Sequence, residues 1–435
     1  MAAVNVTTSP GLRVTDHRVD VPVDWAHTDG ETLQVFAREV VDPAKANADL
    51  PLLLFLQGGP GGKGPRPQRD GWLPVALRTH RVMLLDQRGT GRSSRVDGAD
   101  ISRFADPAAA AAYLRCFRAD SIVADAEHLR TTVYGGRRWE TLGQSYGGFI
   151  TLTYLSQAPQ GLAACYVTGG LASLEPSAAE VYRRTYPRVA ARVRRFYDRY
   201  PADADLVAAV ADHVAASDVR LPDGDRLTVH RLQALGGDLG MAAGVDELHW
   251  LFDEAWADER RPDRLSETFC RQVAERTAFA DNPLFVVMQE SIYGHGADGP
   301  ATGWAAAAER ERHPEFAETA RPLTFTGEMM FPWMFSEIRA LRPFEAAAHA
   351  LASTPGWSDL YDLDRLAAND VPVSAVIYHD DLYVDAGLSL RTAEHVGNCE
   401  AWVTNEYEHD GLRRDPAVLE RLLDRIRDRG GPLTG

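Results

Sequence analysis

The sequence has 435 residues, of which 45% are hydrophobic and 25% charged, and its formal net charge is −16. A chain of this length exceeds what one hydrophobic core usually fills, so we expect two lobes or a core with a large insertion. The acidic balance argues against nucleic acid and anionic membranes as partners, because both require a basic face on the protein.

The four cysteines are widely spaced and form no C-x-x-C pair: Cys116, Cys165, Cys270 and Cys399. We expect them to be free thiols in a reducing compartment. The first 16 residues lack a basic patch followed by an apolar run, so no signal peptide is predicted. No stretch approaches the roughly 18 apolar residues of a membrane-spanning helix. The prediction is a cytoplasmic protein without a membrane partner.

The first 170 residues predict a sheet with helices between its strands. Residues 12–40 alternate weakly between apolar and polar, which is typical of antiparallel strands with one wet face. Helical periodicity occupies about 107–133. Apolar runs predict buried strands at 52–56, 82–86 and 164–168, and residues 138–142 read as a further short strand. Strands that alternate with helices indicate an α/β class with a mostly parallel central sheet and helices on both faces.

From Glu175 to about Leu351 the pattern is helical, with little strand-like sequence. Strand-like runs then return at 372–378 and 401–403. This order predicts a helical insertion between two halves of one sheet. We therefore expect three segments: 1–175 as the first part of the core, 176–355 as a helical cap domain, and 356–435 as the second part of the core.

Residues 143–147 read G-Q-S-Y-G, with Ser145 at the centre of a G-x-S-x-G pattern. A predicted strand precedes this pattern, and a helix is predicted from Phe149 to Gln157. In an α/β-hydrolase such a pattern is the nucleophile elbow, a strained turn that lifts the serine hydroxyl out of the sheet. The flanking glycines are needed because neighbouring Cβ atoms would clash. Five-residue patterns also occur by chance, so the interpretation depends on finding partners for Ser145.

A serine nucleophile needs an orienting carboxylate, which in this fold follows the serine in the chain. Asp380 and Asp381 come directly after the strand predicted at 372–378. The spacing does not decide between them, and Asp385 is a further candidate.

The general base should be a histidine that follows the last strand. His409 does so, in an acidic loop. Two competitors, His379 and His395, precede the last predicted strand and look solvated. Without the serine, His409 would read as a surface histidine; with Ser145 and the aspartates in the right order, we predict a catalytic role.

Two backbone N–H groups would form the oxyanion hole. One belongs to Tyr146, directly after the nucleophile, and the other to Gly58 or Gly59 in the glycine-rich turn after the strand at 52–56. A glycine at this place lets a substrate carbonyl approach the backbone closely.

The same turn supports an alternative from another class. Residues 59–64 satisfy G-x-G-x-x-G after a strand, and Asp86 ends the next strand, as in a dinucleotide-binding fingerprint. That fingerprint requires a helix to open within the turn, whereas Pro65 and Pro67 follow here. The phosphate-binding P-loop pattern also fails, because Lys63 is followed by Gly64. No metal-ligand spacing occurs, and we expect neither a metal nor a cofactor.

Two carboxylates of the predicted cap stand among apolar and aromatic residues: Glu290 and Glu328. A carboxylate in such surroundings is costly unless it is paired. It could bind the ammonium group of a substrate or an arginine of the protein, and the residues alone favour the arginine.

Four segments resemble the proline iminopeptidases (prolyl aminopeptidases), a family of serine exopeptidases with the α/β-hydrolase fold. Residues 57–61 (Q-G-G-P-G) resemble the family's H-G-G-P-G oxyanion loop, with Gln57 as a departure from histidine. Residues 86–93 (D-Q-R-G-T-G-R-S) resemble its D-Q-R-G-x-G-x-S block. Residues 143–148 resemble its nucleophile elbow, and 405–409 its histidine segment.

The resemblance implies Ser145 as nucleophile, Asp381 as orienting acid and His409 as general base. Asp381 is preferred because the family's acid commonly precedes a Met- or Leu-type residue, as Leu382 is here. It also implies that Glu290 and Glu328 bind the free amine of the substrate.

The expected activity is release of an N-terminal residue, preferentially proline, from short peptides with a free N-terminus. An apolar pocket from Tyr293, Phe331 and Trp333 would select the proline ring. An esterase or amidase with the same triad is the nearest alternative, and the oligomeric state is left open.

Overall fold

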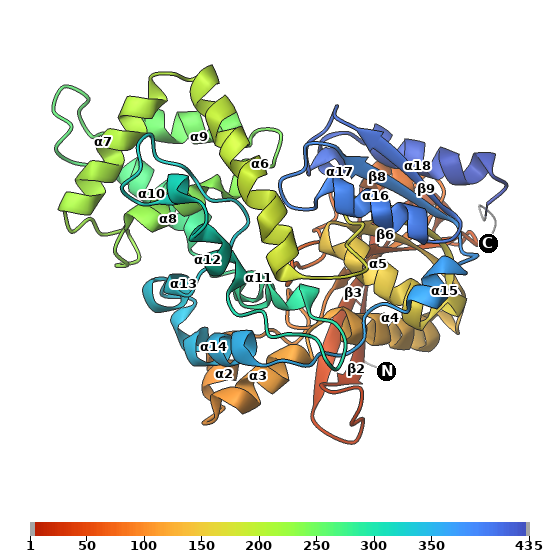
Figure 1. Cartoon of the computed structure of the whole chain (residues 1–435). Helices are drawn as coiled ribbons and strands as arrows, with labels where there is room; N and C mark the ends of the chain where they lie inside the picture. The colour runs from red at the N-terminus through yellow and green to blue at the C-terminus, as the bar shows by residue number, and fades with distance from the viewer. Residues whose placement is uncertain (1–4, 432–435) are drawn as a thin grey trace.

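The computed structural model describes residues 5–431, which contain a nine-stranded sheet of order β1-β2-β3-β5-β4-β6-β7-β8-β9 (Figure 1). The strands are β1 (Val6–Ser9), β2 (Leu12–Pro22), β3 (Thr32–Val41), β4 (Leu52–Leu56), β5 (Arg81–Asp86), β6 (Trp139–Gln144), β7 (Leu162–Thr168), β8 (Val373–Tyr378) and β9 (Cys399–Thr404). Pairing is antiparallel from β1 to β5 through β2 and β3, and parallel from β5 to β9.

The apolar run of β4 follows from burial on both faces of the sheet. Its alternate residues Leu54 and Leu56 belong to a hydrophobic cluster with α4 (Ala119–Tyr134) and α5 (Tyr146–Gln157). Leu53 and Phe55 point to the other face, in a cluster with α1 (Leu73–Ala76) and α18 (Ala417–Asp428). A strand covered on both faces reads as a continuous hydrophobic run.

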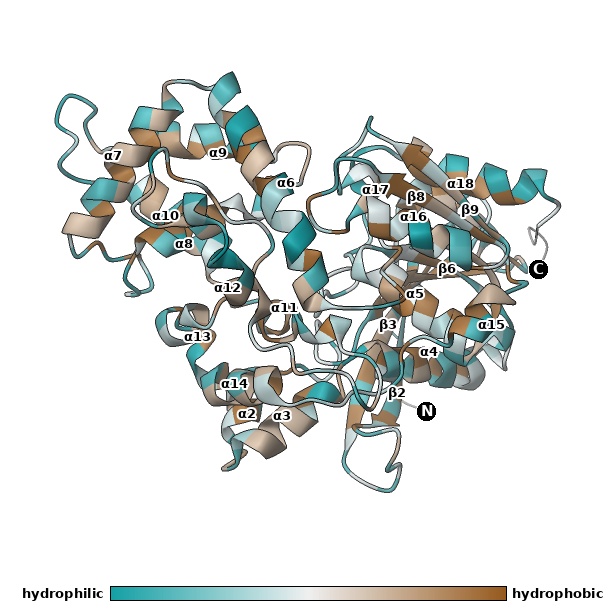
Figure 2. Ribbon diagram, in the orientation of Figure 1, coloured by the Kyte–Doolittle hydropathy of each residue, from teal (hydrophilic) through white to brown (hydrophobic). Residues whose placement is uncertain are grey.

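Hydrophobic residues are concentrated along β8, whereas α18 carries polar residues on the side away from the sheet (Figure 2). The predicted α/β class, with a mostly parallel sheet and helices on both faces, is confirmed. The helical pattern at 107–133 is interrupted: α3 (Pro107–Arg115) ends at Cys116, and α4 begins after Arg118.

Between β7 and β8, a fully described part of the chain holds helices and no strand of the sheet. The longer ones are α6 (Ala178–Arg199), α7 (Asp203–Ala216), α9 (Gly244–Asp253), α10 (Glu267–Thr277) and α14 (Glu345–Ser353). Shorter ones include α8 (Val229–Gln233), α11 (Pro283–Met288), α12 (Ala305–Arg310) and α13 (Trp333–Glu337). Figure 1 shows α6 to α10 standing beside the sheet, while α14 packs against α3.

Of the four remaining helices, α2 (Gly98–Ser102) lies beside α3 and α14 (Figure 1). The other three precede, connect and follow β8 and β9: α15 (Leu363–Ala367), α16 (Ala386–His395) and α17 (Gly411–Arg414). The loops after β6, β8 and β9 lead into α5, α16 and α17. Because these three strands are parallel, their carboxyl ends meet at one edge of the sheet. None of the helices in residues 5–431 is long and apolar enough to cross a membrane.

Candidate active site

Ser145 sits on the sharp turn between β6 and α5, with a φ of 55° and a ψ of −124°. A side-chain-bearing residue in this region is strained, and such strain is often found at functional sites. The turn needs its glycines: a Cβ on Gly147 would overlap the carbonyl of Leu56, and one on Gly143 would overlap the carbonyl of Gly147. The local sequence therefore produces a tight turn that exposes the serine hydroxyl at the edge of the sheet.

His409 and Asp381 are joined by a hydrogen bond of 2.7 Å between Nδ1 and Oδ2. The other oxygen of Asp381 accepts the backbone N–H groups of Tyr383, at 2.8 Å, and Val384, at 3.1 Å. Burial on its own lowers the pKa of His409, but the adjacent Asp381 carboxylate outweighs it and raises that pKa above 6.5. Asp381 therefore fixes the orientation of the imidazole and stabilises its protonated form.

The two alternative carboxylates have other partners. Asp380 is exposed, with an oxygen 3.2 Å from the ring of His379. Asp385 caps α16 and pairs with Arg188 at 2.9 Å. Of the three candidate aspartates, the structure brings Asp381 into contact with His409.

The two competing histidines lie away from Ser145. The side chain of His379 is 67% exposed. His395 lies at the end of α16, where its ring is 3.0 Å from the carbonyl oxygen of Leu363. Neither residue lines the cavity that contains Ser145 and His409.

The helical segment after β7 holds the loop of His409 in place. The backbone N–H of His409 donates to the carbonyl of Gly240, at 3.1 Å. Arg192 of α6 forms two hydrogen bonds of 2.8 Å with Glu408. The ring of Tyr383 meets His409 edge to face, with centroids 4.8 Å apart. The position of the imidazole thus depends on residues from both parts of the chain.

A cavity of about 390 Å³ is lined by Ser145, His409, Gly58 and Gly59 together. Gly58 lies directly against the serine, since a Cβ placed on it would be 2.9 Å from the Cβ of Ser145. Its N–H donates to Oε1 of Gln57 at 3.0 Å, so this donor must exchange its partner to bind an oxyanion. The N–H of Tyr146 belongs to the first turn of α5, where backbone donors have no partner within the helix.

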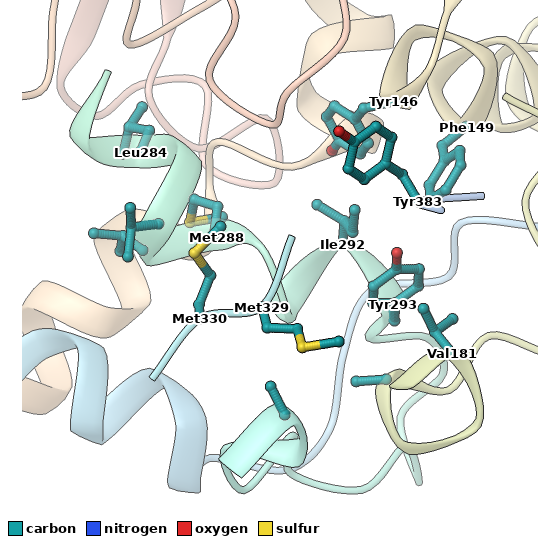
Figure 3. Packing of buried hydrophobic residues seen from close by; sticks show 14 of the residues in the cluster. Tyr146, Phe149, Val181, Leu284, Met288, Ile292, Tyr293, Met329, Met330 and Tyr383 are labelled. Atoms are coloured by element: carbon teal, nitrogen blue, oxygen red, sulfur yellow. The ribbon is translucent and has the colours of Figure 1, made fainter. Parts of the chain in front are cut away.

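The apolar lining of the cavity differs from the predicted pocket. It consists of Leu235, Met241, Phe279, Phe285, Met329, Met330, Met334 and Tyr383. Four of the chain's seven methionines are among them. Figure 3 shows Met329 and Met330 on an extended segment facing the helix of Met288. Methionine side chains adapt to ligands of different shape.

The three residues predicted to form the proline pocket are absent from this lining. Phe331 and Trp333 stack on each other, with centroids 6.3 Å apart, and Trp333 packs against His230. Tyr293 is buried next to Phe149. Aromatic residues close to Glu328 in the sequence are thus directed into the core of the helical segment.

Glu328 lines the cavity and has no cationic side chain within salt-bridge distance in the described part of the chain. Its burial raises the pKa of the carboxyl from 4.5 to about 7. His409 and a hydrogen bond with Gln289 lower this pKa, and Asp381 raises it. An unpaired carboxylate therefore shares a cavity with the serine and the histidine. The residues alone favoured an arginine partner, but none pairs with Glu328 in the range 5–431.

Glu290 has backbone partners instead. Its two oxygens accept the N–H groups of Ala305 and Ala306, each at 3.0 Å, at the start of α12. Burial raises its pKa to about 7, and Glu290 does not line the cavity. The sequence did not point to Tyr182 of α6, which lies near Glu290 and Glu328. Its buried hydroxyl has no hydrogen-bond partner in the part of the chain that the structure describes.

The turn at 57–64 does not lead into a helix, since the next one, α1, begins at Leu73. The alternative of a dinucleotide site therefore lacks the helix N-terminus that would hold the pyrophosphate. Within residues 5–431 no group of three or more histidine, cysteine, aspartate or glutamate side chains could hold a metal ion.

Comparison with known proteins agrees with this geometry. A family model described as the alpha/beta hydrolase fold matches residues 51–216. A proline iminopeptidase of Aeromonas sobria is 44% identical over 96% of this chain and 97% of its own length. A proline iminopeptidase of Aspergillus aculeatus is 32% identical over 96% of this chain and 95% of its own. The solved proline iminopeptidase of Mycobacterium smegmatis is 14% identical over 98% of both chains, with a TM-score of 0.40.

Proposed function

The chain belongs to the proline iminopeptidase family of α/β-hydrolases, and from this premise we propose that it is a prolyl aminopeptidase. It releases an N-terminal residue, preferentially proline, from short peptides through an acyl-enzyme intermediate. The similarity to two proline iminopeptidases, 44% and 32% identical over 96% of this chain, supports the aminopeptidase activity. The observation that carries the exopeptidase character is the unpaired carboxylate of Glu328 in the cavity of Ser145 and His409.

In the proposed mechanism, His409 takes the proton of Ser145 as the hydroxyl attacks the first peptide carbonyl. Asp381 holds the imidazole through its 2.7 Å hydrogen bond and stabilises the imidazolium that forms. The backbone N–H groups of Tyr146 and of the Gly58–Gly59 turn stabilise the oxyanion. His409 then protonates the leaving amine, and water, deprotonated by the same histidine, hydrolyses the acyl-enzyme and restores Ser145.

Glu328 binds the protonated N-terminal amine of the substrate. The ammonium group supplies the cation that this carboxylate lacks in the free protein, and the pairing lowers the pKa of Glu328 toward its usual range. An N-acylated peptide has no such charge and leaves the carboxylate unpaired, which is costly. Glu290 lies outside the cavity and holds the start of α12, while Tyr182, whose hydroxyl has no hydrogen-bond partner within residues 5–431, is near both carboxylates.

The segment 176–355 acts as a cap over the carboxyl edge of the sheet. Its residues Met329, Met330 and Glu328 close one side of the cavity around Ser145. The cap thereby limits the acyl side to a single N-terminal residue.

The test measures release of a chromogenic amine from proline, alanine and leucine arylamides, with N-acetylproline arylamide as the blocked substrate. Cleavage confined to free-amine substrates, fastest for proline and absent from Ser145→Ala, is the expected result. The variant Glu328→Gln should lose the discrimination against the blocked substrate. Glu311→Gln is the matched control, since Glu311 is an exposed carboxylate of the same segment that lies outside the cavity. Equal cleavage of blocked and free substrates by the unmodified enzyme would indicate an esterase or general amidase.

A further inference from the structure

Besides Glu328, the cavity of Ser145 is lined by a charged residue of opposite sign, Arg413 on α17. Arg413 lines this cavity and has no carboxylate within 4 Å among the described residues. Its side chain also makes no hydrogen bond in that part of the chain. The next residue, Arg414, is exposed too but does not line the cavity. Arg413 is therefore an available cation at the opening of the site.

The other charges around Arg413 are already engaged. Arg276 also lines the cavity, but it pairs with Asp238 at 3.1 Å and with Glu247 at 3.2 Å. Asp410, close to Arg413 in the chain, accepts the backbone N–H of Ala242 at 3.0 Å. Among residues 5–431, the cavity thus presents one anion without a cationic partner, Glu328, and one cation without an anionic partner, Arg413.

Arg413 lies close to His409, the residue that protonates the leaving amine in the proposed mechanism. The histidine that protonates the leaving amine must face that amine, and Arg413 follows His409 by four residues. The guanidinium is close enough to His409 to oppose the rise in the pKa of the imidazole. A small adjoining cavity of about 100 Å³ shares Gln57, Gln144 and Arg413 with the main one. The space for the residue after the scissile bond therefore borders this guanidinium.

We propose that Arg413 binds the C-terminal carboxylate of the substrate and makes the enzyme selective for free peptides of two or three residues. The inference rests on the proposed aminopeptidase function and extends it to the leaving-group side. A short peptide is a zwitterion whose ammonium and carboxylate groups match Glu328 and Arg413 at the two ends of one cavity. A guanidinium can bind a carboxylate through two parallel N–H···O bonds. In a long peptide the carboxylate lies beyond the reach of this residue.

The experiment compares kcat/KM for Pro-Ala and Pro-Ala-Ala with that for the same peptides carrying a C-terminal amide. We expect the unmodified enzyme to prefer the free acids, and Arg413→Gln to lower the acid-to-amide ratio about fivefold, the size of a partly exposed ion pair. Arg413→Lys should retain part of the preference for the free acid. Lysine keeps the positive charge but cannot form the two parallel N–H···O bonds of a guanidinium. Arg414→Gln is the matched control, and its ratio should equal that of the unmodified enzyme. Raising the ionic strength should also lower the ratio, because Arg413 is exposed.

An acid-to-amide ratio near one in the unmodified enzyme, or a ratio equally affected by Arg413→Gln and Arg414→Gln, would overturn the role of Arg413. Neither result would contradict the proposed aminopeptidase function. That function would be refuted only if the enzyme cleaved neither the free-acid nor the amidated proline peptides. Because Arg413 is exposed and makes no side-chain hydrogen bond in residues 5–431, its variants should unfold at the same temperature as the unmodified protein.

Discussion

Replacing Glu328 by glutamine should stabilise the protein at pH 8 while impairing recognition of the amine. The folded-state pKa of Glu328 is raised from 4.5 to about 7 by burial. Below pH 4.5 the carboxyl is protonated in both the folded and the unfolded chain, so it has no effect on stability. Between pH 4.5 and 7 the unfolded chain ionises first, and the free energy of unfolding falls as the pH rises.

The full penalty is reached above pH 7. A shift of about 2.5 pKa units corresponds to about 3 kcal/mol, at about 1.4 kcal/mol per unit. This is an upper bound, because Glu328 faces a cavity that admits water. Glutamine carries no charge at any of these pH values, so the difference between Glu328→Gln and the unmodified protein should grow from near zero at pH 4.5 to about 2–3 kcal/mol at pH 8.

The assay is chemical denaturation of both proteins at pH 4.5, 6 and 8, with Glu311→Gln as control. Subtracting the unmodified protein removes the effects of all other titrating groups. A variant that is less stable than the unmodified protein at pH 8 would refute the reasoning, because it would mean that Glu328 has a cationic partner in the free protein. The same pKa predicts that KM for a proline arylamide rises about tenfold from pH 8 to pH 6, because the ionised fraction of Glu328 falls from about nine tenths to about one tenth.

Three further predictions concern the groups around Ser145. Asp381→Asn should lower kcat by roughly 10³-fold or more, because the imidazole loses its orienting acceptor, while Asp380→Asn should change kcat less than about twofold in the same steady-state assay. Glu290→Gln should lower the free energy of unfolding at pH 5 by about 1 kcal/mol in chemical denaturation, because an amide has one acceptor oxygen for the two N–H groups of α12. This loss should shrink or reverse at pH 8, because burial raises the pKa of Glu290 to about 7 and its ionised form then lowers the stability of the unmodified protein. Replacing either Arg192 or Glu408 should lower kcat about tenfold in the arylamide assay through the position of the histidine loop, and the double variant should lose little more.

Each of these has a result that would contradict it. Equal effects of Asp380→Asn and Asp381→Asn would mean that the orienting contact is not specific to one carboxylate. A rise in KM without loss of stability at pH 5 in Glu290→Gln would assign that residue to the substrate and not to α12. Additive losses in the Arg192 and Glu408 variants would mean that the two side chains act independently.

The sequence predicted the sheet well because the information is local. The apolar run at 52–56 and the glycines around Ser145 each follow from short-range constraints: burial on both faces of a strand, and close approach at a turn. The order Ser145, aspartate, His409 along the chain predicted which loops would meet. The catalytic roles of these residues stay a prediction that the variants above test.

The choice between Asp380 and Asp381 could not be made from spacing, because adjacent loop residues can point in opposite directions. It depends on the backbone N–H groups of Tyr383 and Val384, which bind one oxygen of Asp381 and leave the other for His409. The proline pocket was predicted from aromatic residues near Glu328 in the sequence. In the structure Met329 and Met330 take that place, since the course of the segment after Glu328 decides which side chains face the cavity.

Among the described residues, two charged side chains that line the cavity of Ser145 have no ion-pair partner, and a partner for either one would stabilise the free protein. An unpaired Glu328 opposes folding above pH 4.5, and Arg413 forgoes an ion pair although Asp410 is close in the chain. The neighbouring charges Arg276, Asp238, Arg192 and Glu408 are all paired. Unpaired charges that line the same cavity as Ser145 and His409 are what a site for a zwitterionic ligand requires, since a protein partner for either group would compete with the substrate. Selectivity for the free amine and for the free carboxylate should therefore be separable by single substitutions at these two positions, with Ser145, His409 and Asp381 unchanged.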